Sequence, residues 1–387
     1  MLQNTKNPVR QSLFGLTAAG KVFFCALAFA GCLSVNVYGA LVCCAVCCAA
    51  SVFLKNRILY PDAFLIVPLV FVAGTAGNAL LPLTVIAGAV LFFAVSRIQN
   101  ALKVPESVML GASVGLAFSV TALLTTYYFG IGANGATVFE MLKNYRYLGF
   151  HPNWRGVFYG TITLFAMITY PFKFRRLSKY LPAEVVSLAI PFVLNLLLNP
   201  NGETTPILEF GSLSSVAGIR GLGGFLPVAD TPSEVGSFLS PVLQGAFSLA
   251  VIMLLFGEKD SKISNISSAA SAAAGIFGGF PAVSTEIKCY SVSSAAVAVV
   301  SSAAVGLLFP SLLSRLPLHS LAVVLIVSAW QKVKFSRFGT MFKTEKVLGA
   351  VLFASVVASF VFLGVFKALV ICVLLAALMR GAERRAA

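Results

Sequence analysis

Two short stretches, "YPDAFLIV" at residues 60–67 and "FPAVSTEI" at residues 280–287, begin with an aromatic residue and a proline and then place charges in apolar sequence. Each opens an apolar segment of 11 residues, at 63–73 and 282–292, which measures about 16 Å as a helix. A bilayer core is about 30 Å thick, so neither segment crosses a membrane alone. The two stretches therefore predict a pair of half-helices that begin inside the protein.

The composition predicts an all-α polytopic membrane protein embedded in a lipid bilayer. Of 387 residues, 58% are hydrophobic and only 11% are charged, and the mean hydropathy is +0.93. We expect about fourteen apolar segments, at 15–35, 38–54, 62–73, 79–96, 105–129, 154–171, 183–199, 238–257, 263–277, 282–292, 293–309, 318–332, 346–363 and 365–380. The last ends near Met379, so we expect no soluble domain.

The distribution of basic residues predicts the orientation. With both termini in the cytoplasm, only Lys143, Arg146, Arg155, Arg220, Arg315 and Lys367 fall outside, and Lys21 and Lys288 fall within segments. This agrees with the positive-inside rule. The net charge of +15 thus reflects topology, and no nucleic-acid partner is expected. We expect a plasma (inner) membrane location and one long external loop, at residues 201–236.

The order of the segments predicts an inverted repeat. The two short segments are third and tenth, and the fifth and twelfth also share a proline start, at Pro105 and Pro317. Because the halves are offset by seven segments, an odd number, the second runs inverted. An inverted repeat with broken helices in matching positions is typical of secondary transporters.

Two half-helices that enter from opposite faces point their N-termini at each other, and a helix N-terminus binds anions. We therefore predict a substrate site with eight residues from the half-helix starts, namely Pro61, Asp62, Ala63, Phe64, Ala282, Val283, Ser284 and Thr285. Lys288 lies two helical turns past Pro281, and we predict that it supplies a positive charge near the anion. Alternatively, Lys288 forms an ion pair with Glu286 or Asp62 that closes the helix bundle.

Asp62 and Glu286 would repel an anion unless each is protonated, paired or bound to a cation. A carboxyl group in a low-dielectric cavity has a raised pKa and carries a proton at neutral pH. We therefore expect symport with a proton or sodium, for which Asp62, Glu286 and Glu258 are the coupling candidates. Glu258 has a second interpretation, as part of an ordinary cytoplasmic loop.

Catalytic chemistry is not expected. The two histidines, His151 and His319, lie in no cluster that provides a nucleophile with its base. Cys43, Cys44, Cys47 and Cys48 have helical spacing, but no histidine or carboxylate nearby completes a metal site. We expect no enzyme activity, no metal and no cofactor.

The sequence resembles the sulfate permease family of inorganic anion transporters. Four stretches carry the resemblance: "GLTAAGKVFFCALAFAGCLSVNVYGAL" (15–41), "VPESVMLGASVGLAFS" (104–119), "GIFGGFPAVSTEIKCYS" (275–291) and "LPLHSLAVVLIVSAW" (316–330). Lys288 falls where the family carries a basic residue. The C-terminal STAS domain that is usual in the family has no counterpart here, and the missing domain leaves open whether a separate protein replaces it.

The resemblance implies a seven-plus-seven fold with a core domain (14–104 and 237–309) and a gate domain (105–200 and 310–381). It implies transport of sulfate, bicarbonate or a similar anion by an elevator movement of core against gate, and a homodimer. The alternative is a nucleobase or xanthine permease of the same fold, in which Glu286 would bind the base. The Asn-Gly that usually follows such a glutamate is replaced by Ile287-Lys288.

Overall fold

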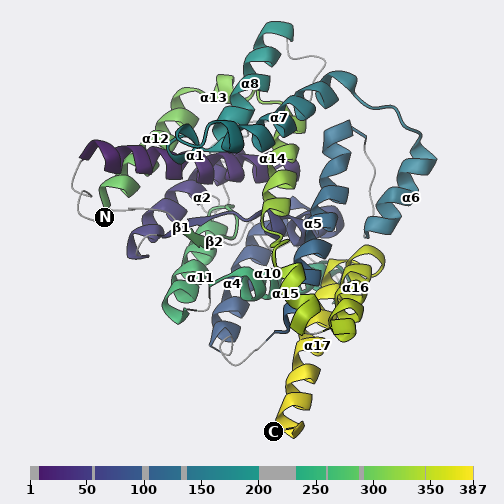
Figure 1. Ribbon diagram of the computed structural model, residues 1–387. Helices are drawn as coiled ribbons and strands as arrows, with labels where there is room; N and C mark the ends of the chain where they lie inside the picture. Colours follow the sequence, from purple (N-terminus) through teal and green to yellow (C-terminus); the bar gives the residue numbers. More distant parts are fainter. Residues whose placement is uncertain are drawn as a thin grey trace.

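The computed structural model describes residues 8–54, 57–97, 104–131, 137–199, 232–258, 260–286, 292–344 and 346–386, which form helices joined by short connections, with two short strands (Figure 1). The first part contains α1 (Pro8–Leu33), α2 (Val37–Ala50), β1 (Arg57–Tyr60), α3 (Ile66–Ala76), α4 (Leu81–Ser96), α5 (Glu106–Phe129), α6 (Val138–Leu148), α7 (Trp154–Lys173) and α8 (Ala183–Leu198). The second part contains α10 (Pro232–Phe256), α11 (Ser261–Ile276), β2 (Val283–Glu286), α12 (Val292–Leu308), α13 (Pro310–Leu313), α14 (Leu318–Gln331), α15 (Arg337–Thr344), α16 (Lys346–Phe362) and α17 (Val365–Ala386).

Four helical stretches are long and apolar enough to cross a membrane: Gly15–Leu33, Asn78–Ser96, Glu106–Phe129 and Phe238–Phe256. Several others, α2, α8, α12, α14 and α16 among them, contain apolar helix of 10–17 residues. The predicted apolar segments coincide with helices except at 282–292. The all-α membrane class is therefore confirmed, whereas the number of crossings stays a prediction.

Helix α4 packs against α10 and α11. Small residues allow the close approach: Gly88 of α4 lies against Leu249 of α10, and Gly275 of α11 lies against Val85 of α4. Close approach at small residues is the usual way in which helices associate in a membrane.

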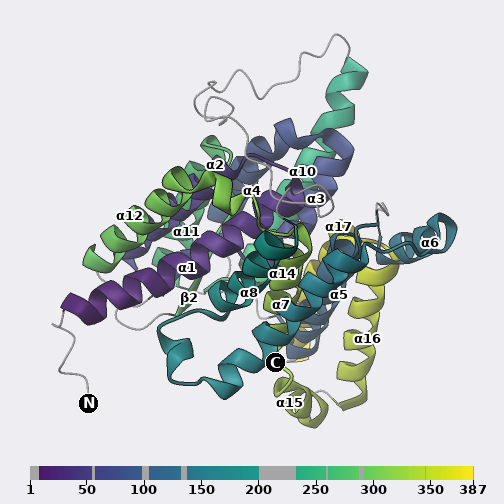
Figure 2. The same cartoon turned by 90° about the horizontal axis from the view of Figure 1, so that it is seen from above.

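Helix α12 packs in the same manner against α1 and α2, which are the corresponding helices of the first half. Gly15 of α1 approaches the backbone of Ser294, and Gly306 of α12 lies against Leu41 of α2. Figure 2 shows α1 and α12 side by side along most of their lengths. Helix α12 is thus related to α1 and α2 as α4 is to α10 and α11, which is the reciprocity that an inverted repeat produces.

This correspondence leaves α3 without a helical partner in the described part of the second half. The half-helix predicted at residues 282–292 is wrong over Val283–Glu286, which is extended and forms β2. Only residues 287–291, which lie outside the described ranges, separate β2 from α12, and five residues are too few for a half-helix of three turns.

Strands β1 and β2 pair in antiparallel fashion, with Arg57 opposite Glu286 and Tyr60 opposite Val283. The chain therefore runs through Tyr60 and Pro61 directly from the ladder into the start of α3. By contrast, Pro281 precedes its strand. The two aromatic-proline motifs, although alike in sequence, occupy different positions relative to the ladder.

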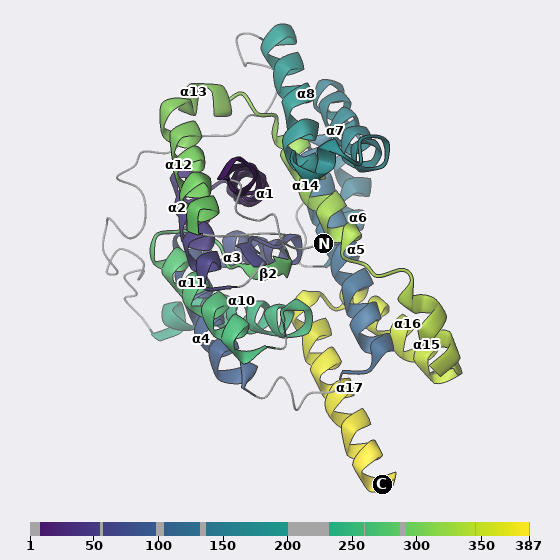
Figure 3. The same cartoon turned by 60° about the vertical axis from the view of Figure 1, so that its left-hand side comes forward.

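The remaining contacts form a second group of helices. Helix α14 packs against α5 and α7, α7 packs against α8, and α16 packs against α5 and α17. Figure 3 shows α5, α7, α8, α14 and α16 on one side, and α2, α4, α10, α11 and α12 on the other. Helix α1 contacts α14 and α8 across the boundary. The core and gate boundaries implied by the resemblance stay a prediction.

Candidate functional site

The start of α3 is shaped by Asp62. Its Oδ1 accepts a hydrogen bond from the backbone N–H of Phe64 at 3.0 Å, and its own carbonyl accepts one from Leu65 at 2.9 Å. A single 3₁₀ turn, Ala63–Leu65, then continues as α3. An aspartate is among the best N-cap residues because its side chain satisfies an otherwise unpaired amide and its charge stabilises the positive end of the helix.

Lys332, the residue directly after α14, forms an ion pair with Oδ2 of Asp62. The Asp62 side chain is 2% exposed and that of Lys332 is 24% exposed. The pair joins the start of α3 to the end of α14, two elements that also pack directly against each other. A charge buried at this depth is costly unless it is paired, so each residue stabilises the other.

Tyr60 connects this pair to a second lysine. The ammonium groups of Lys21 on α1 and of Lys332 lie 4.9 and 5.1 Å from the centre of the Tyr60 ring. The Tyr60 hydroxyl donates a hydrogen bond to Oδ2 of Asp62 at 3.4 Å. Two cations on one ring, beside a helix N-terminus, concentrate positive charge in the interior of a membrane protein.

A second acidic residue, Glu184 on α8, belongs to the same region. It is 8% exposed, and its carboxylate lies within electrostatic range of Tyr60 and Cys25. The helices approach closely here because Gly20 of α1 packs against Val185 of α8. Glu184 therefore faces α1 across the boundary between the two groups of helices.

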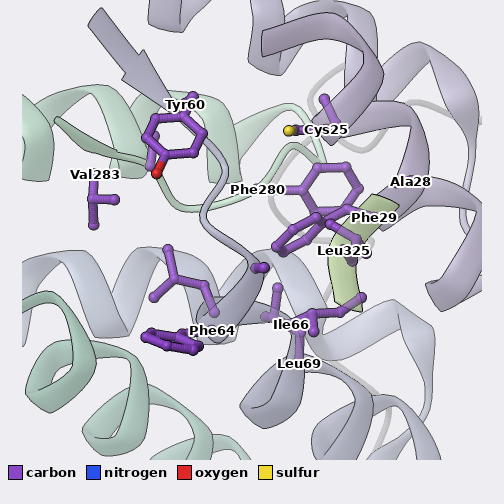
Figure 4. Close-up of a cluster of buried hydrophobic side chains, with 14 of the residues drawn as sticks. Cys25, Ala28, Phe29, Tyr60, Phe64, Ile66, Leu69, Phe280, Val283 and Leu325 are labelled. Carbon is purple, nitrogen blue, oxygen red and sulfur yellow. The ribbon is translucent and has the colours of Figure 1, made fainter. Parts of the chain in front are cut away.

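Aromatic and apolar side chains line the other sides of Tyr60 and the start of α3. The rings of Phe29 and Phe280 lie 5.3 Å apart, between α1 and the turn before β2 (Figure 4). Phe64 packs on Phe256 of α10, with ring centres 5.0 Å apart, and is fully buried. This packing fixes Tyr60 and Asp62 in an apolar setting, where electrostatic attraction is stronger than in water.

The segment at 282–286 does not form the predicted helix N-terminus. Ser271 accepts a hydrogen bond from the Ala282 amide at 3.0 Å, and Ser267 donates to the Ala282 carbonyl at 2.6 Å. Val283–Glu286 are engaged in the ladder with β1. The hydroxyl oxygen of Ser284 is buried and, within the described residues, has no hydrogen-bond partner.

Arg57 contacts Glu258 and Glu286, the two remaining acidic residues that were predicted as coupling candidates. It forms an ion pair with Glu258, and its guanidinium lies 3.7 Å from Glu286, whose side chain is 84% exposed. An exposed pair of this kind contributes little to stability. This exposure does not favour the nucleobase alternative, in which Glu286 would bind a substrate inside the protein.

The structure therefore brings together Pro61, Asp62 and Ala63 and, across the ladder, Val283 and Ser284, but it separates Asp62 from Glu258 and Glu286. Within the described residues Asp62 pairs with Lys332 and Glu286 with Arg57, while the predicted ion pairs of these acids with Lys288 stay a prediction. Lys288 itself lies outside the described residues. Substrate-binding roles for all of these residues stay predictions.

Sequence reasoning missed Lys21, Tyr60, Lys332 and Glu184. A signal for Lys21 was present, because a lysine in the middle of an apolar segment is expensive and marks a functional position. Lys332 carried no such signal, since it stands at a segment end where basic residues are ordinary. Among the described residues, no group of three histidines, cysteines or acids is arranged to hold a metal ion.

Comparisons with known proteins identify the fold. No protein-family model matches the sequence, and no curated protein matches it. The structure matches the transmembrane domain of the cyanobacterial bicarbonate transporter BicA at 16% identity with a TM-score of 0.73, covering 94% of this chain and 98% of that one.

Two structures of solute carrier 26 family member A9 (SLC26A9) also match. The first, of the murine anion transporter in the inward-facing state, has 11% identity and a TM-score of 0.75 and covers 99% of this chain and 69% of that one. The second has 13% identity and a TM-score of 0.69 and covers 96% of this chain and 65% of that one. The chain is therefore a helical membrane protein with the fold of the BicA transmembrane domain, which it shares with about two thirds of SLC26A9.

Proposed function

We propose that the protein is a secondary transporter that moves a small inorganic anion, such as bicarbonate or sulfate, across the membrane. The observation that carries this proposal is the half-buried positive charge of Lys21 and Lys332 around Tyr60, at the N-terminus of α3. It stands in a fold that is shared with proteins described as bicarbonate and anion transporters.

In this proposal the anion binds beside Tyr60. The N-terminus of α3 supplies a partial positive charge, Lys21 and Lys332 supply full charges, and the Tyr60 hydroxyl is a hydrogen-bond donor. The Ser284 hydroxyl is a further donor, because its oxygen is buried with no partner among the described residues. Lys288 remains a candidate for a third cation from residues 287–291.

Transport is proposed to be an elevator movement between the two groups of helices. The start of α3 belongs to the group with α1, α4 and α10, and Lys332 belongs to the group with α5 and α7. A site assembled from both groups changes whenever one group slides along the other. Alternating access by movement of one bundle against another is the common mechanism of inverted-repeat transporters.

Coupling to a proton is proposed for Asp62. A bound anion and an ionised Asp62 repel each other in an apolar setting, and this repulsion is removed when Asp62 takes up a proton. Sodium at the carboxylate would serve the same purpose. Glu258 and Glu286 are weaker candidates because both are held by Arg57, away from Asp62.

A transport panel in proteoliposomes tests the function. Labelled sulfate, bicarbonate, chloride, nitrate, oxalate and uracil are offered with and without inward proton and sodium gradients. We expect uptake of at least one inorganic anion, increased by one of the two gradients. Uptake of uracil alone, stopped by Glu286→Gln, would establish the nucleobase alternative, and uptake of no anion would refute the proposal.

Lysine variants locate the site in the same assay. Lys21→Ala and Lys332→Ala should abolish uptake. The matched control is Lys143→Ala, because Lys143 lies 5.9 Å from the ring centre of Tyr147 in a similar lysine–tyrosine arrangement on α6, at the protein surface. Lys288→Ala tests the remaining cation. Equal uptake by Lys21→Ala, Lys332→Ala and wild type would place the substrate elsewhere.

A further inference from the structure

The Asp62–Lys332 ion pair bridges the two groups of helices at the proposed site. Asp62 is fixed to the start of α3 because its side chain accepts a hydrogen bond from the Phe64 amide. Lys332 is the first residue after α14. The start of α3 also packs against α14 and α5. Any sliding of α3 along α14 therefore has to break this ion pair.

The Asp62 carboxylate holds the position that an incoming anion needs. It neutralises Lys332 and the N-terminus of α3 at once. Among the described residues around Tyr60, the charges of Lys21 and Lys332 balance those of Asp62 and Glu184 when all four are ionised. An anion that enters without a change in this set leaves a net negative charge in a buried region, which is strongly unfavourable.

We propose that Lys332 is a substrate-binding residue, and that the transported anion binds by taking the place of Asp62 at Lys332. This inference rests on the proposed function and deepens it. Without substrate, Asp62 holds Lys332 and ties α3 to α14. When the anion arrives, Asp62 releases Lys332 and takes up a proton from the side on which the anion enters, and the two groups become free to move.

The exchange makes anion binding dependent on pH. Asp62 contacts two ionisable groups directly, Tyr60 on β1 and Lys332 after α14. Lys21 and Cys25 on α1 and Glu184 on α8 lie around Tyr60, and Lys334 lies within electrostatic range of Lys332. When the anion binds, Lys332 exchanges the Asp62 carboxylate for the anion and keeps a negative partner, whereas Asp62 loses its cation and takes up the proton. One proton per anion raises the affinity about tenfold for each pH unit by which the solution is made more acidic, while Asp62 is ionised in the free protein.

The variant Asp62→Asn isolates the charge from the helix cap. Asparagine is as good an N-cap as aspartate, so the hydrogen bond from Phe64 and the start of α3 are preserved. The negative charge that competes for Lys332 is removed. The matched control is Glu106→Gln, because Glu106 of α5 lies 3.7 Å from Arg337 of α15. Helix α15 packs against α5 and α16, so this ion pair stays within one group of helices.

Binding of labelled sulfate and chloride to the purified full chain, over a range of pH, tests the exchange. Neither probe changes its own charge in the neutral range. Wild type and Glu106→Gln should bind at least one probe about tenfold more tightly per unit of falling pH. Asp62→Asn should bind that probe independently of pH and more tightly than wild type at high pH, and Lys332→Gln should lose at least tenfold in affinity.

Unchanged pH dependence in Asp62→Asn, or unchanged affinity in Lys332→Gln, would overturn the exchange. A second measurement separates this failure from failure of the proposed function. Spin labels at Thr75→Cys on α3 and Gly339→Cys on α15, both exposed, report the distance between the two groups. The native cysteines in the described ranges are buried, and Cys289 is replaced by serine.

Without any anion, Asp62→Asn should broaden or shift the distance distribution, whereas Glu106→Gln should match wild type. If no probe binds wild type and the distribution still changes in Asp62→Asn, the ion pair restrains the movement but the anion function is wrong, and with it the assignment of Lys332 to substrate. If the distribution in Asp62→Asn equals that of wild type, the restraint itself is refuted.

Discussion

Asp62 both caps a helix and forms a buried ion pair. Its Oδ1 caps α3, and its Oδ2 receives both Lys332 and the Tyr60 hydroxyl. The cap was predictable because Pro-Asp before an apolar run is a helix-start signal. The partner was not, since Lys332 is 270 residues away (332 − 62) and nothing local in the sequence links the two.

Gly156 of α7 lies against His319 of α14, and a substitution at this glycine tests how closely the two helices pack. A Cβ added to Gly156 would lie 1.9 Å from Nε2 of His319, which is buried. Gly156→Ala should therefore lower the thermal unfolding temperature, with a cost of about 1–3 kcal/mol in the free energy of unfolding.

Gly74→Ala is the control for this variant, because no atom lies within 4 Å of an added Cβ and alanine favours helix. It should be as stable as wild type or slightly more stable. The double variant Gly156→Ala with His319→Ala should regain most of the loss. Equal stability of Gly156→Ala and wild type would mean that α7 and α14 are not packed as described.

At the scale of elements, two motifs of similar sequence adopt different structures. After Pro61 comes Asp62, which caps a helix, whereas after Pro281 come Ala282 and alternating β-branched residues, Val283 and Thr285. Branched side chains favour extended backbone, and no capping residue opposes them. The alternation of Val283 and Thr285 indicates a strand and is visible in the sequence. The half-helix was predicted instead because the two aromatic-proline motifs are alike and matching positions of a repeat were expected to share one structure.

Helix α11 holds the turn before β2 through hydroxyl groups, and this arrangement is testable. Ser271→Ala leaves the buried Ala282 amide without its partner at 3.0 Å, which should cost about 1–3 kcal/mol. Slower folding of the ladder and faster amide hydrogen exchange at Ala282 are the expected readouts. Ser301→Ala on α12 is the control, because that hydroxyl only bonds a carbonyl of its own helix. Equal protection of Ala282 in both variants would contradict this role.

At the scale of the whole molecule, the sequence predicted the helices and their inverted order better than their contacts. Apolar runs of α1, α4, α5 and α10 define the helices, and the odd offset of the halves defines the inversion. The packing of α1 between α12 and α14 depends on small residues such as Gly15 and Gly20, whose partners lie far along the chain. A single sequence does not identify those partners.

Crosslinks across and within the two groups of helices test the elevator movement. Gly20→Cys with Val185→Cys places two thiols across the boundary between α1 and α8, where an added Cβ lies 2.9 Å from Val185. Gly88→Cys with Leu249→Cys places two thiols within one group, with an added Cβ 3.0 Å from that of Leu249. Oxidation should stop uptake in the first variant, reversibly with reductant, and spare it in the second. Uptake that persists in the first would refute a sliding boundary at α1.

The Asp62–Lys332 pair also has a consequence for biogenesis. During synthesis α3, an apolar helix of 11 residues with an acid at its start, leaves the ribosome long before its lysine exists. At about 5–20 residues per second, the 270 residues between them take on the order of 10 to 50 seconds. Through that interval Asp62 lacks the lysine partner that it has in the folded protein, so the start of α3 completes its contacts only after α14 has been made.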